Sequence, residues 1–158
     1  MADNYLERKF EEYNNPSNVS RRKPQKKIKA RRALIVGLHS DMANVIEHSL
    51  RMIGHSVLVA DSLPSNDDKF EIVISSPSFA CDCVRFVLNN SAATNYGRMV
   101  VVGQIDDLRE LSAKFANANF TINMIEYSES TDLQNIARTC RIFVADENGF
   151  LNGNTLSV

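Results

Sequence analysis

Short apolar runs alternate with amphipathic segments along most of the chain, and this alternation constrains the fold more than any other feature of the sequence. Runs such as Ala33-Leu34-Ile35-Val36 and Met99-Val100-Val101-Val102 are typical of buried strands, and the segments after them repeat apolar residues at helical spacing. Strands that alternate with helices form a parallel sheet with helices on both faces. The sequence therefore predicts an α/β fold, a three-layer, doubly wound parallel sheet of about six strands.

The same pattern gives each element a range. We expect strands at residues 33–36, 55–61, 70–74, 98–102, 120–125 and 141–145, with helices at residues 40–53, 79–88, 106–116 and 132–139. Between Ser62 and Lys69 the chain is polar and too short for a further helix, so a turn is expected there. Residues 32–158 then form one domain, which suits a chain of 158 residues.

Charge separates an arm, residues 1–31, from this domain. Residues 1–32 carry a net charge of +6 and the remaining residues carry −7, although the whole chain sums to −1. Leu6, Phe10 and Tyr13 lie at helical spacing and predict a short amphipathic helix, and a basic run ends at Arg32. That run contains no aromatic residue for base stacking, so we favour a solvated linker over a nucleic-acid contact.

Nothing in the sequence indicates export or a membrane. The N-terminus lacks the apolar core of a signal peptide, and the apolar runs are too short to span a bilayer. The three cysteines, Cys81, Cys83 and Cys140, are expected to be free thiols, and Cys81-Asp82-Cys83 lacks the further ligands that a zinc ion needs. We therefore expect a cytoplasmic protein with no metal site.

A ligand of such a sheet would bind at the carboxyl ends of its strands, so the turn after the first strand is the first candidate site. Dinucleotide binding favours glycines there, and the turn from Val36 to Ala43 offers Gly37 alone. Asp41 falls where a phosphate would arrive, and a carboxylate opposes an anionic ligand. Asp61 follows Gly37 by 24 residues, near the spacing of an acidic residue that accepts ribose hydroxyls.

Two segments of the C-terminal half carry a resemblance to a known family. Phe120-Thr121-Ile122-Asn123-Met124-Ile125 is similar to Ile-Arg-Val-Asn-x-Ile, and the segment from Phe143 to Val158 is similar to Phe-Leu-x-Ser-Asp-x-x-x-x-Ile-x-Gly-x-x-x-x-Val. On these segments, residues 32–158 resemble a shortened, divergent member of the short-chain dehydrogenase/reductase family. The resemblance implies a Rossmann-like body and leaves the arm unexplained.

The family's chemical motifs are missing from the matching positions. One glycine remains of Thr-Gly-x-x-x-Gly-x-Gly, and the Tyr-x-x-x-Lys segment has no counterpart in the domain. Ser75-Ser76-Pro77-Ser78 stands for Asn-Asn-Ala-Gly, and Gly103-Gln104 stands where the catalytic serine would lie. Hydride transfer in that family needs a tyrosine activated by a nearby lysine, and Tyr127 is expected to be only a surface loop residue. The comparison implies a fold without its family's catalysis.

A receiver domain of the response-regulator type is a rival architecture, because Leu34 to Ser75 also fits its first three strands. Receivers need acidic residues after the first strand and an aspartate after the third. Those places hold Gly37-Leu38 and Ser75-Ser76, so phosphotransfer chemistry would be missing as well. We keep a receiver-like, non-phosphorylated regulatory domain as the weaker alternative.

We therefore expect a catalytically degenerate Rossmann-like domain that acts through self-association or partner binding. The resemblance implies association through the helices beside the fourth and fifth strands. No cofactor is expected. The alternative is an NAD(P)-binding oxidoreductase with an altered site, in which the nucleotide would contact Gly37, Ser40, Asp61 and Ser75.

Overall fold

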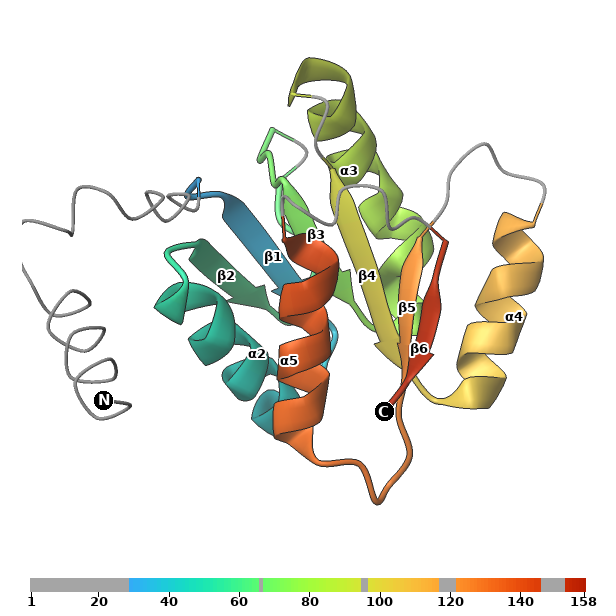
Figure 1. The fold of residues 1–158 in the computed structure, drawn as a ribbon. Coiled ribbons are helices and arrows are strands. Elements are labelled where there is room, and N and C mark those ends of the chain that lie inside the picture. Colours follow the sequence, from blue (N-terminus) through green and yellow to red (C-terminus); the bar gives the residue numbers. More distant parts are fainter. Residues whose placement is uncertain (1–28, 66, 95–96, 117–121, 146–152) are drawn as a thin grey trace, which may run out of the picture.

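Six parallel strands form the single sheet of the protein (Figure 1). The computed structural model describes residues 29–65, 67–94, 97–116, 122–145 and 153–158, so the predicted arm helix lies outside the described residues. The strands are β1 (Arg32–Val36), β2 (Ser56–Ala60), β3 (Ile72–Ser75), β4 (Arg98–Gly103), β5 (Asn123–Glu126) and β6 (Thr155–Ser157). Their order in the sheet is β2-β1-β3-β4-β5-β6.

Helices cover both faces of the sheet, which confirms the three-layer, doubly wound arrangement. They are α2 (Ser40–Met52), α3 (Ala80–Thr94), α4 (Ile105–Phe115) and α5 (Leu133–Val144), and a short 3₁₀ turn, η2 (Pro77–Phe79), precedes α3. Helices α2 and α5 lie side by side on one face (Figure 1), and their buried side chains share one apolar core. The buried side chains of α3 and α4 share a second core on the other face.

Alternation along each strand produces these two cores. In β1, Ile35 points into the core under α2 and α5, and its neighbours Leu34 and Val36 point into the core under α3 and α4. All three side chains are fully buried. A strand that is buried on both faces must be apolar at every position, which is why continuous apolar runs marked the central strands in the sequence.

One expected strand is wrong. Residues 141–145 were predicted as the sixth strand, but Arg141 to Val144 form the last turn of α5, and β6 lies further on, at Thr155–Ser157. Ile136, Cys140 and Phe143 are fully buried and lie at helical spacing, so the apolar run continues one buried helix face. A short apolar run fits a buried helix as well as a buried strand, which explains the error.

The strand order shows where the chain reverses its direction of winding. From β1 the chain moves outward to β2 and then crosses back to β3 on the other side of β1, so the switch point lies between β1 and β3. Strands β1 to β5 follow the flavodoxin-like order 2-1-3-4-5. The classic doubly wound order is 3-2-1-4-5-6, and it becomes the order seen here when its edge strand 3 is left out and the remaining strands are renumbered. The missing strand would come between β2 and β3, where the described residues also contain no helix.

Side chains at the amino ends of the strands fix the entry into the sheet. The buried Arg31 forms an ion pair with Glu71, and its backbone N–H donates to Nδ1 of His55 at 3.1 Å. Arg32 lies over the ring of Phe70, 4.5 Å from its centroid. These contacts all lie at the end of the sheet opposite the strand carboxyl ends, so they leave that end free for ligands.

Candidate functional site

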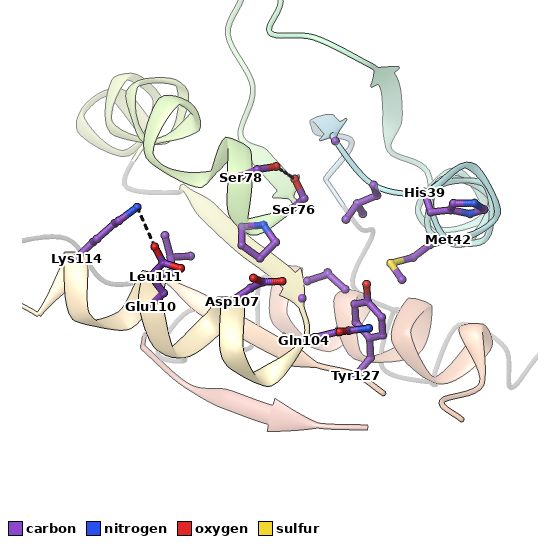
Figure 2. Close-up of a pocket in the computed structure, with 15 residues that line it drawn as sticks. His39, Met42, Ser76, Ser78, Gln104, Asp107, Glu110, Leu111, Lys114 and Tyr127 are labelled. Carbon is purple, nitrogen blue, oxygen red and sulfur yellow. Dashed lines mark hydrogen bonds and ion pairs between the residues drawn. The ribbon is translucent and has the colours of Figure 1, made fainter. Parts of the chain in front are cut away.

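A cavity of about 560 Å³ lies at the carboxyl ends of the central strands (Figure 2). This is the crevice at the switch point, where open α/β sheets bind their ligands, and its volume lies within the range of small-molecule sites. We call it the switch-point cleft. Its walls come from the turn before α2, the loop between β3 and α3, the end of β4, helix α4 and the residue after β5. The lining residues are Gly37, Leu38, His39, Met42, Ser76, Pro77, Ser78, Val102, Gly103, Gln104, Asp107, Glu110, Leu111, Lys114 and Tyr127.

Two glycines allow the loop between β3 and α3 to pack closely against the carboxyl ends of β1 and β4. A Cβ atom built on Gly37 would lie 2.6 Å from Oγ of Ser76 and 2.8 Å from Cε2 of Phe79. A Cβ built on Gly103 would lie 2.5 Å from Cγ of Pro77. All three distances are far below ordinary contact, so each glycine is needed for the close approach of this loop. We call Ser76 to Phe79 the wedge loop.

Gly37 also needs its backbone conformation, because its φ of +76° lies in the left-handed region. Its N–H donates to the carbonyl of Ala60 at 3.4 Å, and the N–H of Ser76 donates to the carbonyl of Val36 at 3.2 Å. The turn is therefore held from both sides, by β2 and by the wedge loop. In a dinucleotide-binding turn the first glycine serves the tight turn, and a later glycine lets the backbone approach the pyrophosphate. Here only the first glycine is present, and protein side chains pack on its Cβ side while its backbone stays exposed in the cleft.

The N-terminus of α2 lies at the edge of the cleft. His39 is the N-cap residue, and its Nδ1 accepts from the N–H of Asp41 at 3.4 Å. Ser40 and Asp41 are exposed and do not line the cleft. The carboxylate that we expected to face an arriving phosphate is therefore exposed at the start of α2, beside His39, and is not part of the cleft lining.

Acidic side chains nevertheless line the cleft, and they come from α4. Asp107 and Glu110 face it together with Lys114, whose ammonium lies 3.9 Å from the Glu110 carboxylate (Figure 2). Asp106 and Asp107 occupy the first turn of α4, where carboxylates favour the positive end of the helix dipole. Two carboxylates against one ammonium leave a net negative charge along this wall, which does not suit a dianionic pyrophosphate.

Tyr127 is a lining residue that the sequence analysis missed. We expected a surface loop residue, but the tyrosine is half-buried, packs against the core under α2 and α5, and lines the cleft. Its N–H donates to the carbonyl of Gly103 at 3.1 Å. Strand β5 ends at Glu126, one residue later than predicted, so Tyr127 stands directly at the strand's carboxyl end. The signal that could have found it is this end-of-strand position.

Three of the four residues proposed for a nucleotide, Gly37, Asp61 and Ser75, stand at the carboxyl ends of the neighbouring strands β1, β2 and β3, and Ser40 begins α2. Gly37 lines the cleft, whereas Ser40, Asp61 and Ser75 do not. Asp61 is exposed and directly follows Ala60 at the end of the edge strand β2. Ser75 is fully buried in β3, and within the described part of the chain its Oγ has no hydrogen-bond partner. The four residues therefore share one end of the sheet, but only Gly37 lines the cleft.

The cysteines supply no nucleophile to the cleft. Cys81 is exposed, and Cys83 and Cys140 are buried. Burial raises the pKa of Cys140 to about 12. Burial, with a smaller contribution from the Asp82 carboxylate against the Arg85 guanidinium, raises the pKa of Cys83 to about 12. Thiols with such pKa values stay protonated at neutral pH and are poor nucleophiles.

The described ranges also contain no group of three His, Cys, Asp or Glu side chains that could hold a metal ion. None of the described helices combines the length and the hydropathy that a membrane span requires.

Comparisons with known proteins support the fold alone. No protein-family model matches the chain, and no curated protein matches it. Among solved structures, the chain is similar to a doubly substituted variant of a Serratia marcescens short-chain dehydrogenase/reductase, with a TM-score of 0.53 and 12% sequence identity. The likeness covers 81% of this chain and 95% of the other chain. The chain therefore has a Rossmann-like α/β fold of the kind found in that dehydrogenase.

Proposed function

We propose that this chain is a non-catalytic Rossmann-like domain that works through self-association and does not bind a dinucleotide. The observation that carries the proposal is the packing of the wedge loop against Gly37. Ser76 and Phe79 occupy the space on the Cβ side of this glycine, at the turn where a dinucleotide of this fold class would bind. A dinucleotide could use that side of Gly37 only if the wedge loop moved away, and this would expose the partly buried ring of Phe79.

The charge of the cleft supports the same conclusion. Asp107 and Glu110 face the cleft, and the one lysine there already lies beside Glu110. Helix N-termini attract anions, but a carboxylate in the first turn of α4 offsets that attraction. An NAD(P) pyrophosphate would therefore meet like charge at short range.

An altered-site oxidoreductase is the second candidate, because the cleft does contain one tyrosine and one lysine, Tyr127 and Lys114. Family-type hydride transfer needs the lysine close enough to lower the tyrosine pKa. Figure 2 shows the two side chains at opposite ends of the cleft, and Lys114 pairs with Glu110. The arrangement favours the non-catalytic proposal.

Calorimetry and sedimentation test the two halves of the proposal separately. Titration of NAD⁺, NADH, NADP⁺ and NADPH into the full chain should release no binding heat at millimolar ligand. Saturable heat with any of the four would favour the oxidoreductase instead. Sedimentation equilibrium of the full chain should give a mass above that of the monomer at micromolar concentration, and a monomer throughout would contradict self-association.

A further inference from the structure

Two surfaces could carry the association that we proposed, and α4 is the less suitable one. All eleven residues of this helix are described, and Ile105 is its one large apolar side chain that is exposed. Its exposed side chains outside the cleft include two charged ones, Asp106 and Arg109, and no second large apolar one. The fully buried centre of a protein interface is depleted in charged residues. Helix α4 is therefore a poor candidate.

The outer edge of β2 is the better candidate surface for self-association. β2 is the terminal strand of the sheet, and among the described residues no strand pairs with its outer side. In the classic doubly wound order a further strand lies outside the second strand, so this edge is where that larger sheet would continue. The strand reads Ser56-Val57-Leu58-Val59-Ala60, without a charge or a proline. Exposed edges usually carry such protecting residues, and an edge that lacks them is a template for another strand.

The hydrogen bonds to β1 define which backbone groups face outward. The N–H of Ser56 donates to Arg31, and the carbonyl of Ala60 accepts from Gly37. Since N–H and C=O groups alternate sides along a strand, Val57 and Val59 direct theirs to the open edge. The carbonyl of Val57 does point that way, because it accepts from the Arg51 guanidinium at 2.7 Å.

Apolar side chains flank this edge on both faces of the sheet. Leu58 is 38% exposed and Val59 is 39% exposed. Leu58 lies on the face that α3 and α4 cover further along the sheet. Among the described residues between β2 and β3 there is no helix to cover it here.

We propose that two copies of this chain associate through antiparallel pairing of their β2 strands about a twofold axis at Leu58. This inference rests on the proposed self-association and names its surface. Val57 of each copy pairs with Val59 of the second copy, which forms about four main-chain hydrogen bonds. The two Leu58 side chains then lie opposite each other at the axis and cover each other. A twofold interface of this kind closes on itself and stops at a dimer.

Charge complementarity favours a second copy as the occupant of the edge. Antiparallel pairing centred on Leu58 brings Asp61, at the carboxyl end of one β2, to the amino end of the other β2. Arg51 already places its guanidinium at that amino end, beside Val57. Each Arg51 also pairs with Glu47 of its own helix at 3.2 Å through Nε. Two Arg51–Asp61 pairs would form, one on each side of the axis, and each Arg51 would exchange its Nη2 bond to the Val57 carbonyl for the carboxylate.

Disulfide trapping tests the register directly. Residues directly opposite at a non-hydrogen-bonded position have Cα atoms about 4.5 Å apart, within disulfide range. In full-length Cys81→Ser protein, Leu58→Cys should therefore form an intermolecular disulfide on mild oxidation. The matched control is Val59→Cys, which is equally exposed but lies roughly 8 Å from its own copy across the axis, beyond disulfide range. Equal trapping of both variants, or of neither, would overturn the register.

A charge swap provides an independent readout in solution. Asp61→Arg should weaken the dimer roughly tenfold, because it replaces two attractions with two repulsions. The double variant Arg51→Asp/Asp61→Arg should restore the dissociation constant of the parent, and unfolding curves of both variants confirm that they fold. An unchanged dimer in Asp61→Arg would overturn the β2 interface while leaving self-association intact. A monomeric parent whose Val57 and Val59 amides resist hydrogen exchange would show that another segment covers the edge, and it would overturn both proposals.

Discussion

Replacing Gly37 with alanine measures how tightly the wedge loop packs against this glycine. The alanine would keep a φ of +76°, which costs about 1–2 kcal/mol for a residue with a Cβ. Its methyl group would also lie 2.6 Å from Oγ of Ser76 and 2.8 Å from Cε2 of Phe79. Overpacking of this kind adds about 1–3 kcal/mol. We therefore expect Gly37→Ala to lower the free energy of unfolding by about 2–5 kcal/mol in total.

Gly54 is the matched control for this experiment. Its φ is +101°, so an alanine there is also strained, but a Cβ would meet nothing within 4 Å. Urea unfolding of Gly54→Ala should show the backbone cost alone, about 1–2 kcal/mol. The change that alanine makes in the unfolded chain is the same in both variants and cancels. If Gly37→Ala is no more destabilising than Gly54→Ala, the wedge loop does not pack on Gly37, and the reasoning behind the proposed function fails.

Three further predictions concern the stability and reactivity of the domain. Asp132 accepts from the N–H of Gln134 at 2.9 Å and caps α5, so Asp132→Ala should lower the free energy of unfolding by about 1 kcal/mol in urea titrations. Ellman's reagent should label Cys81 in the native protein and reach the two buried thiols only on unfolding; three reactive thiols under native conditions would contradict the buried positions. Because burial raises the folded-state pKa of Cys140 from 9.0 to about 12, its stabilising contribution is complete below pH 9 and is lost as the pH rises toward 12. Cys140→Ala should therefore flatten the loss of stability between pH 9 and pH 12, and an unchanged slope would refute this assignment.

The sequence predicted the sheet well because its central strands are buried on both faces. A doubly buried strand must be apolar at each position, and runs such as Met99 to Val102 can hardly be anything else in a chain of this composition. The segment from Arg141 to Val144 was wrongly predicted as a strand, because it is also a short apolar run. Its apolar residues instead complete a buried helix face that begins at Ile136. Only the packing against α2 decides between the two structures.

The candidate site was harder to predict, because its shape depends on contacts between distant segments. Gly37 was recognised as the glycine of the first turn, but the sequence could not show that Phe79 fills the space above it. The sequence singled out Asp41 as the carboxylate that would meet an arriving phosphate. In the structure Asp41 is exposed and does not line the cleft, whereas Asp107 of α4 does. Side-chain directions at helix starts depend on the packing of the whole layer.

The central claim is that the wedge loop keeps dinucleotides away from the backbone of the switch-point cleft. The most direct measurement is a nitrogen–proton correlation spectrum of the full chain, recorded during titration with NADH and NADPH. If the claim is correct, the amide signals of Gly37 and Gly103 stay in place at millimolar ligand. Saturable shifts of these two signals, together with those of the wedge loop, would contradict it.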